Sequence, residues 1–138
     1  MSEFDDWNNK IIAEFRASGG TAEAFKGANL LLLHHTGAKS GTERVSPLVY
    51  MKAGDSYAVF GSAAGGPRHP AWYYNLAAHP DTTIEVGTST VQVRARVATP
   101  QERAPLWERQ KGVAPGFAEY ETKAAPRQIP VVLLDPAK

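Results

Sequence analysis

The sequence predicts an α+β, mainly β domain: a small antiparallel barrel of about six strands with peripheral helices. Short apolar runs follow one another in two hairpin-like groups separated by turn residues. Strand and helix patterns do not alternate along the chain, which disfavours a doubly wound parallel sheet. The 138 residues are 43% hydrophobic and 21% charged, as in an ordinary globular protein. We therefore expect a single domain over 1–138, with an N-terminal helix and loop at 1–27 and a barrel at 28–135.

The first part of the chain is expected to form one helix and three strands. Apolar residues recur at spacings of three and four between Phe4 and Ser18, which indicates an amphipathic helix that ends at Gly19. The apolar run that follows is short and bounded by turn residues, as is typical of a buried strand, and a hairpin comes after it. These three strands are predicted at 28–36, 44–52 and 57–60.

The rest of the chain is expected to add three helices and three strands. Valine and alanine alternate with polar residues between Thr90 and Ala98, so this strand has one buried face and one wet face. Thr99 and Pro100 stand in the order of a helix start, and Gly112 is expected to end that helix. Pro130 indicates that the last strand begins at an edge or a bulge. The elements are predicted at 71–78, 82–86, 90–98, 100–111, 115–124 and 128–134.

Composition and charge exclude several classes of function. The chain has no cysteine, which excludes a disulfide scaffold, a cysteine nucleophile, an iron-sulfur cluster and a thiolate zinc site. A net charge of +1 gives no strong field, so we expect no nucleic-acid partner. The longest apolar run, Leu30–Leu33, is far short of the ~20 residues that span a bilayer. We expect a cytoplasmic protein, whose N-terminal helix leaves open only a weak contact with a membrane surface.

A glycine-rich turn at 37–41 places cations next to backbone donors. It is not a P-loop, because Ala38 precedes the lysine, Leu33 stands where the first glycine would be, and a strand follows. No G-x-G-x-x-G follows a strand, so a Rossmann site is not supported. Such a turn can hold an anion on its backbone N–H groups, and it can equally be an exposed hairpin turn with solvated side chains. Its polar residues are Lys39, Ser40 and, on the next strand, Arg44.

The pattern supports neither a metal site nor a serine hydrolase. His34 and His35 are adjacent and point to opposite faces of a strand, so without a bulge they cannot both bind one metal ion. His69 and His79 lie beside prolines in separate loops. No H-E-x-x-H, carboxylate triad or G-x-S-x-G elbow accompanies them. We therefore expect no metal.

The segment 62–75 has an unusual density of flat rings and polar groups. It combines a flexible loop at Gly65–Gly66 and the cation of Arg68 with Trp72–Asn75 on one helix. This combination indicates a functional unit of loop and helix. The alternative is that Trp72 and Leu76, four residues apart, are simply the core face of that helix.

Two segments resemble the deazaflavin-dependent nitroreductase family. Thr36–Leu48 matches its T-G-x-K-S-G-x-x-R-x-x-P-L pattern. Ser62–Leu76 is similar to its Ser-led glycine-rich loop followed by P-x-W-x-x-N-L, and Ile129–Val132 also fits. The resemblance covers the chain from about residue 28 to residue 135.

The resemblance implies a split β-barrel oxidoreductase that uses coenzyme F-420, a deazaflavin with an anionic tail of phosphate and glutamates. A planar ring needs an apolar slot, an anionic tail needs cations and backbone donors, and both occur here. The first segment would grip the tail through Lys39, Ser40, Gly41 and Arg44. The ring and its ribityl chain would be bordered by Val45, Ser46, Pro47, Leu48, Phe60, Gly61, Ser62, Ala63, Ala71, Trp72, Tyr73, Tyr74 and Asn75.

The chain departs from the family pattern at two places. Ala63 stands where several relatives carry a lysine near the tail, and Arg68 of the same loop is the candidate to replace that charge. Ala114 and Phe117 stand where nitroreductase members place tyrosines over the substrate, and only Tyr120 is retained. Reduction of nitroimidazoles is therefore not expected.

The predicted function is hydride transfer from reduced coenzyme F-420 to a small activated acceptor: an enone, a quinone, an unsaturated lactone or a nitro compound. Ser62 or Tyr120 is predicted to donate a hydrogen bond to the acceptor oxygen, a contribution of ~3 kcal/mol, and Phe117 lies on the substrate side. Two alternatives remain: a flavin mononucleotide (FMN) enzyme on a similar barrel, and a non-catalytic carrier of the deazaflavin. A monomer or a weak homodimer is expected.

Overall fold

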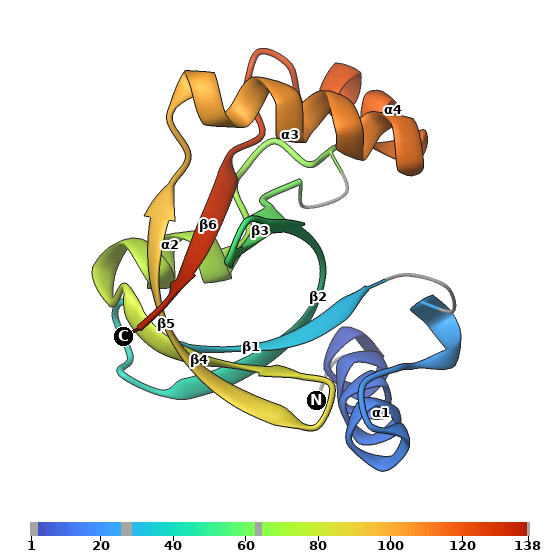
Figure 1. The fold of residues 1–138 in the computed structure, drawn as a ribbon, viewed down its shortest axis with the longest axis vertical. Coiled ribbons are helices and arrows are strands. Elements are labelled where there is room, and N and C mark those ends of the chain that lie inside the picture. The colour runs from blue at the N-terminus through green and yellow to red at the C-terminus, as the bar shows by residue number, and fades with distance from the viewer. Residues whose placement is uncertain (1–2, 26–28, 63–64, 138) are drawn as a thin grey trace.

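The computed structural model describes residues 3–25, 29–62 and 65–137, and shows six strands and four α-helices in them (Figure 1). The helices are α1 (Glu3–Ser18), α2 (Ala71–Ala78), α3 (Pro100–Val113) and α4 (Gly116–Ala124), and a short 3-10 helix, η1 (Glu23–Phe25), follows α1. The strands are β1 (Leu30–Thr36), β2 (Glu43–Ala53), β3 (Ser56–Phe60), β4 (Asp81–Val86), β5 (Ser89–Val97) and β6 (Val131–Pro136).

The six strands form one closed barrel. Their order is β1, β2, β3, β6, β5, β4, and all neighbours are antiparallel. The barrel closes where β1 pairs with β4, with Leu31 opposite Val86 and Leu33 opposite Ile84. Closure pairs the strands that would otherwise be the edges of an open sheet. The predicted antiparallel barrel with peripheral helices is confirmed.

The barrel interior is an apolar cluster against which α2 packs. Alternate residues of β1 point into it, and Leu31 and Leu33 are fully buried there. Trp72 and Leu76, four residues apart on α2, belong to the same cluster, so their interpretation as a core face is confirmed. The other buried members are Val59, Ile84, Val93, Val132 and Leu134. This packing fixes α2, and with it the segments at both of its ends.

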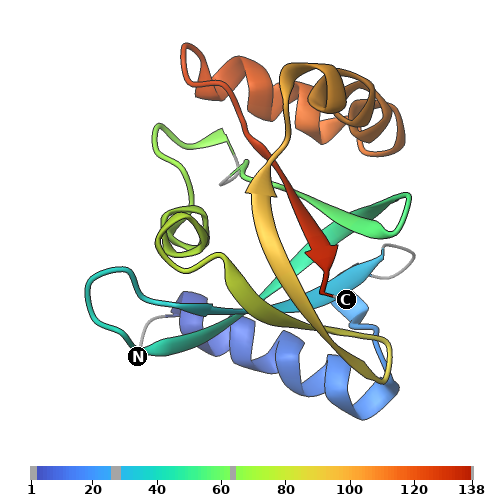
Figure 2. The same cartoon turned by 60° about the vertical axis from the view of Figure 1, so that its left-hand side comes forward.

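Two further clusters hold the other helices on the barrel. In Figure 2, α1 lies along the outside of the barrel, where Ile11 and Phe15 pack against the outward-facing Leu30 and Leu32 of β1. In Figure 1, α3 and α4 cover one end of the barrel, and Trp107 of α3 is 2% exposed in the cluster formed there. Both faces of β1 are thus buried, which explains its unbroken apolar run.

Most predicted elements are confirmed, with differences at their ends. The start of α3 is a capping box: the Glu102 N–H donates to Thr99 Oγ1 at 3.2 Å, and the Thr99 N–H donates to Glu102 Oε1 at 2.9 Å. The expectation that Gly112 ends this helix is wrong. Gly112 is exposed with nothing near its Cβ position, so the helix continues past it at a cost of about 1 kcal/mol relative to alanine. The last strand starts only after Pro130.

Within the described ranges, no helix has both the length and the apolar character needed to cross a membrane. Trp7 of α1 is 45% exposed and its ring centroid lies 5.8 Å from that of Phe25. Arg16 of the same helix pairs with Glu85 of β4 at 2.8 Å. A weak contact of α1 with a membrane surface stays a prediction.

Candidate functional site

The glycine-rich turn between β1 and β2 is closed by its own backbone. The Gly37 N–H donates to the Thr42 carbonyl at 2.8 Å, and the Gly41 N–H donates to the Gly37 carbonyl at 2.9 Å. Gly41 has a φ of +70°, a conformation that favours glycine. A Cβ on Gly37 would lie 2.3 Å from Ser40 Oγ and would displace this hydroxyl, which accepts the Thr42 N–H at 3.2 Å. The conformation of the turn therefore depends on glycine at both positions.

This turn and α2 border a cavity of about 730 Å³. Lys39 and Arg44 are exposed beside it, and neither forms an ion pair within the part of the chain that the structure describes. The N–H groups of Lys39 and Ser40 also have no hydrogen-bond partner among the described residues. The lining residues are Gly37, Ala38, Lys39, Ser40, Arg44, Ala71, Tyr74 and Asn75. Two cations and two backbone donors beside an open cavity are suited to an anion.

A buried polar pair, His35 of β1 and Asn75 of α2, lies next to the turn. The two residues are 3% and 7% exposed. Asn75 Nδ2 lies 2.9 Å from His35 Nδ1, and His35 Nε2 lies 2.8 Å from Ser46 Oγ. Burial, with the charge of Arg44 adding to it, lowers the pKa of His35 to about 4. The His35 ring is therefore neutral at neutral pH.

The loop at 61–69, which carries Ser62, is held by Arg127 from the segment between α4 and β6. The guanidinium donates to three loop carbonyls, those of Gly61 at 3.0 Å, Ser62 at 2.8 Å and Gly66 at 3.0 Å. It also donates to His69 Nδ1 at 2.9 Å, and partial burial together with the Arg127 charge lowers the pKa of His69. Sequence-based reasoning missed Arg127, because its partners lie 58 to 66 positions away and no local pattern marks it.

The same loop contacts α4, which carries two of the predicted catalytic residues. A Cβ on Gly65 would lie 3.1 Å from the Cα atom of Tyr120. The Phe117 ring centroid lies 5.3 Å from that of Tyr120, 5.9 Å from Phe60 and 6.0 Å from Trp107. The three predicted catalytic residues therefore come from two segments that are in contact, the loop and α4.

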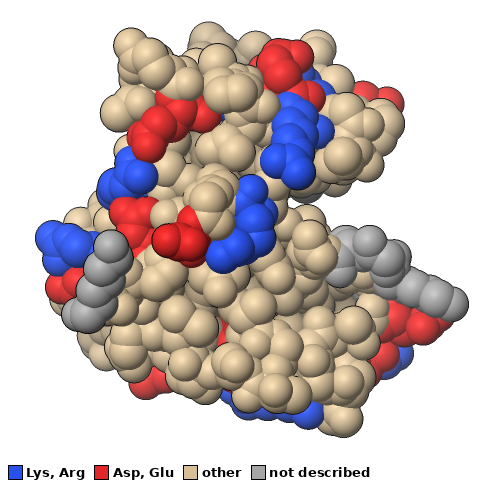
Figure 3. Space-filling view, in the orientation of Figure 1, with Lys and Arg blue, Asp and Glu red and all other residues tan. Residues whose placement is uncertain are grey.

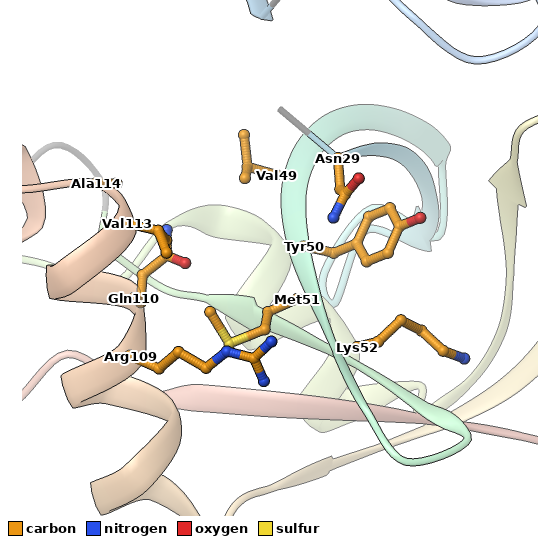
Figure 4. A pocket seen from close by; sticks show the side chains of 9 residues that line it. All are labelled: Asn29, Val49, Tyr50, Met51, Lys52, Arg109, Gln110, Val113 and Ala114. Atoms are coloured by element: carbon orange, nitrogen blue, oxygen red, sulfur yellow. The ribbon is translucent and has the colours of Figure 1, made fainter. Parts of the chain in front are cut away.

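A second cavity, of about 360 Å³, lies between β2 and α3. Figure 3 shows a hollow between the helical end of the molecule and the barrel, and in Figure 4 Arg109 extends from α3 toward β2. Gln110 borders the cavity although it is only 2% exposed. The lining is Asn29, Val49, Tyr50, Met51, Lys52, Arg109, Gln110, Val113 and Ala114. Only Ala114 was expected near a substrate.

The sequence matches the family described as F-420H(2)-dependent quinone reductase over residues 7–136. The chain belongs to this family. It is 40% identical over 107 residues to the F-420H(2)-dependent quinone reductase Rv1261c of Mycobacterium tuberculosis, which covers 75% of this chain and 71% of the relative. The predicted membership of a coenzyme F-420-dependent oxidoreductase family is thus confirmed.

Two solved structures with at least 30% sequence identity superpose on this chain. The structure of an F-420-H2-dependent reductase, FDR-A, superposes with a TM-score of 0.69 at 35% identity, over 78% of this chain and 94% of that one. A structure described as a domain-swapped dimer superposes with a TM-score of 0.71 at 30% identity, over 96% of this chain and 98% of that one. This chain therefore has the same fold as the F-420-H2-dependent reductase FDR-A.

In this quinone reductase family member, the predicted binding residues differ in exposure. Lys39, Ser40, Gly41, Arg44, Arg68, Ala71 and Tyr74 are exposed. Val45, Ser46, Pro47, Leu48, Ser62 and Tyr73 are half-buried. Phe60, Gly61, Trp72 and Asn75 are buried, and Ala63 lies outside the described residues. The exposed set includes all the predicted contacts to the tail.

Several of these side chains already contact other residues of the protein. Val45 packs with the α1 cluster and Leu48 with the barrel interior. The Ser46 hydroxyl contacts His35, and the ring of Tyr73 lies 4.5 Å from that of His69. In the described ranges, no group of three His, Asp or Glu side chains is placed to hold a metal.

Proposed function

We propose that the protein reduces a quinone, or another conjugated carbonyl compound, with reduced coenzyme F-420 as the hydride donor. The acceptor gains the hydride and, at its oxygen, a proton, and the cofactor loses two electrons. Within this family, the observation that carries the proposal is the cavity of about 730 Å³ between the turn at 37–41 and α2. Its cations face open space and have no acidic partner among the described residues.

The residues around this cavity fit the anionic tail of the cofactor. Lys39 would contribute a point charge, and Arg44 a planar fork that can bind a phosphate or carboxylate through two hydrogen bonds. The N–H groups of Lys39 and Ser40 would add neutral donors. Arg68, exposed on the next loop, is the further cation that we assign to the tail. FMN, with a single phosphate, would leave part of this set unused.

We place the deazaflavin ring beside the loop at 61–69 and the N-terminal half of α2. When bound, coenzyme F-420 supplies the hydride, while the chain orients it and excludes water. The Ser62 carbonyl accepts a hydrogen bond from Arg127, which holds the backbone of Ser62, and the Ser62 hydroxyl would donate to the acceptor oxygen. Tyr120, on the helix that contacts this loop, is the second candidate donor.

We place the acceptor between this loop and the cavity of β2 and α3, because Met51 of that cavity packs in one cluster with Phe117 and Tyr120. Val49, Met51, Val113 and Ala114 give this cavity apolar walls, and Gln110 gives it a polar group. A quinone has a flat apolar body and carbonyl oxygens that accept hydrogen bonds, so it suits such a lining. The small side chain of Ala114 leaves room where a tyrosine would fill the cavity.

Fluorescence titration with coenzyme F-420 tests the tail site. Arg44→Ala is expected to weaken binding by about 10- to 100-fold, which corresponds to about 1.5–3 kcal/mol for a hydrogen bond to a charged group. Affinity is expected to fall as salt rises and to exceed that for FMN. Arg94→Ala is the matched control, because Arg94 is exposed on β5, pairs with Asp81 and lies outside the first cavity.

The outcomes separate the alternatives. Equal affinity for FMN and coenzyme F-420, without salt dependence, would favour the FMN enzyme. Tight binding of coenzyme F-420 without oxidation of the reduced cofactor by any quinone, enone or lactone would favour the carrier. Analytical ultracentrifugation over a range of concentrations tests the expected monomer or weak homodimer.

A further inference from the structure

We propose that His35 is a positioning residue for the anionic tail of the cofactor: together with Asn75 it fixes the turn at 37–41 against α2. This inference rests on the proposed function, since it assumes that the tail binds at this turn. His35 itself is 3% exposed and does not line the cavity, so it would act through the turn and not by contact with the cofactor.

The hydrogen bonds define the orientation of each group. The Ala38 N–H donates to Asn75 Oδ1 at 2.9 Å, which leaves Asn75 Nδ2 to face His35. Asn75 Nδ2 then donates to His35 Nδ1 at 2.9 Å, so this nitrogen is the acceptor and the ring proton is on Nε2. The Nε2–H donates to Ser46 Oγ at 2.8 Å. Each hydrogen bond in this series thus fixes the donor or acceptor role of the next group.

The position of His35 would suit an apolar residue if packing alone decided it. Its side chain lies on the same face of β1 as the fully buried Leu31 and Leu33. Burying an imidazole and a carboxamide there is unfavourable unless their polar atoms are paired. Both ring nitrogens and both ends of the Asn75 amide have partners. This pairing makes the polar network stable and specific to one arrangement.

The network acts on the part of the turn that presents the anion donors. Asn75 Oδ1 makes the one hydrogen bond that joins 37–41 to α2 within the described ranges, and it does so at the residue before Lys39. Without His35, the Asn75 amide would lose the partner that holds it in this orientation. The N–H groups of Lys39 and Ser40 would then be less well ordered before the tail binds, which lowers affinity.

His34 provides a matched control on the same strand. Its ring points to the outer face of the barrel, where Nδ1 lies 3.0 Å from Glu43 and Nε2 lies 2.7 Å from Glu85. It has no contact with Asn75 or with the turn among the bonds that the structure describes. A change at His34 therefore alters a histidine of the same strand without altering the network.

The test is a set of binding titrations with two ligands: coenzyme F-420, and its tail-less form that lacks the phosphate and glutamates. His35→Leu is expected to lower the affinity for coenzyme F-420 by about tenfold and to leave the affinity for the tail-less form unchanged. His35→Gln keeps one acceptor and one donor and is expected to restore most of the affinity. His34→Leu is expected to change the affinity for neither ligand. Equal losses for both ligands in His35→Leu would overturn the proposal, since they would indicate a general structural effect.

Amide hydrogen exchange gives a direct readout of the turn. In His35→Leu the Ala38 N–H is expected to exchange faster than in the parent, while the Tyr50 N–H, bonded to the Asn29 carbonyl at 3.0 Å, keeps its rate. Unchanged protection of Ala38 would also overturn the proposal. If His35→Leu does not fold, Asn75→Ala replaces it, because it removes the bond to Ala38 from the other side.

The Arg44→Ala titration separates this inference from the proposed function. If Arg44→Ala leaves coenzyme F-420 binding unchanged, the tail does not bind at this turn and the proposed site is wrong. If Arg44→Ala weakens binding and His35→Leu does not, the site stands and the positioning role of His35 is wrong.

Discussion

Arg127 donates a hydrogen bond of 2.8 Å to the carbonyl of Ser62, although the two residues are 65 positions apart. Because the same guanidinium also holds two glycine carbonyls and His69, one side chain holds both ends of the loop that carries a predicted catalytic hydroxyl. A planar group with five donors is suited to several carbonyls at once. The described residues of the loop that contact Arg127 are therefore held by a residue near the last strand.

Arg127→Ala is expected to destabilise the protein by about 2–4 kcal/mol and to lower kcat for quinone reduction, because it leaves three half-buried carbonyls without a charged donor. Urea unfolding and steady-state kinetics measure the two effects. Arg103→Ala is the control: Arg103 donates twice to the Ile129 carbonyl and lies over the Trp107 ring, and it has no hydrogen bond to the described residues of the loop. It is expected to lower stability and to leave kcat unchanged. Equal losses of kcat in both variants would show that the loop role is wrong.

The local parts of the fold follow from the sequence, since they depend on short-range patterns. The hairpins, the helix face of Trp72 and Leu76, and the capping box of Thr99 and Glu102 each lie within a few residues. The predicted helix end at Gly112 was wrong because an exposed glycine is tolerated inside a helix. The polar signal at 37–44 was also visible, since its cations and glycines are adjacent in the chain.

The remaining site residues have no local signal. His35 meets Asn75 across 40 positions, and Gln110 faces β2 only because α3 crosses the end of the barrel. A histidine at the end of an apolar strand and a glutamine on a helix are common in any sequence. Their roles depend on which segments the barrel brings together, which one sequence does not specify.

The pKa of His35 predicts a pH dependence of stability. The folded state lowers this pKa to about 4, whereas an unfolded histidine has a pKa near 6.5. Above about pH 6.5 His35 is neutral in both the folded and the unfolded state, and its contribution to the free energy of unfolding is fully present. As the pH falls toward 4, the unfolded state takes up a proton that the folded state does not, so the free energy of unfolding falls by up to about 3 kcal/mol.

Urea titrations at pH 7 and pH 5 measure this effect in the parent and in His35→Gln. The parent is expected to lose more stability between these two pH values than the variant, which has no titrating ring. An equal loss in the two proteins would show that His35 does not contribute. Both pH values lie well above the pKa of ion-paired carboxylates in the folded state, such as Glu102, whose pKa Arg96 lowers to about 2. The Arg96–Glu102 ion pair therefore stays intact in the folded protein at both pH values.

Phe117→Tyr is expected to change the preference among acceptors and to leave coenzyme F-420 affinity nearly unchanged. Phe117 is half-buried among the rings of Phe60, Trp107 and Tyr120, so the new hydroxyl adds a donor on the substrate side of α4. Steady-state oxidation of the reduced cofactor with a cyclic enone, a naphthoquinone and a bicyclic nitroimidazole measures the preference. The parent is expected to reduce the first two and not the third. Efficient nitroimidazole reduction by the parent would contradict this assignment.

Gln110→Leu tests the acceptor cavity between β2 and α3. Gln110 is 2% exposed and borders the cavity, and a bound quinone carbonyl would accept a hydrogen bond from its side-chain N–H. Leucine has a similar size without a donor, and the variant is expected to raise KM for a naphthoquinone by about five- to tenfold. Coenzyme F-420 affinity and the melting temperature are expected to stay near those of the parent.

Gln101→Leu is the matched control, because Gln101 is an exposed glutamine in the first turn of the same helix. This variant is expected to change neither KM nor kcat. An unchanged KM in Gln110→Leu, with Phe117→Tyr still altering acceptor preference, would move the acceptor out of this cavity and toward α4.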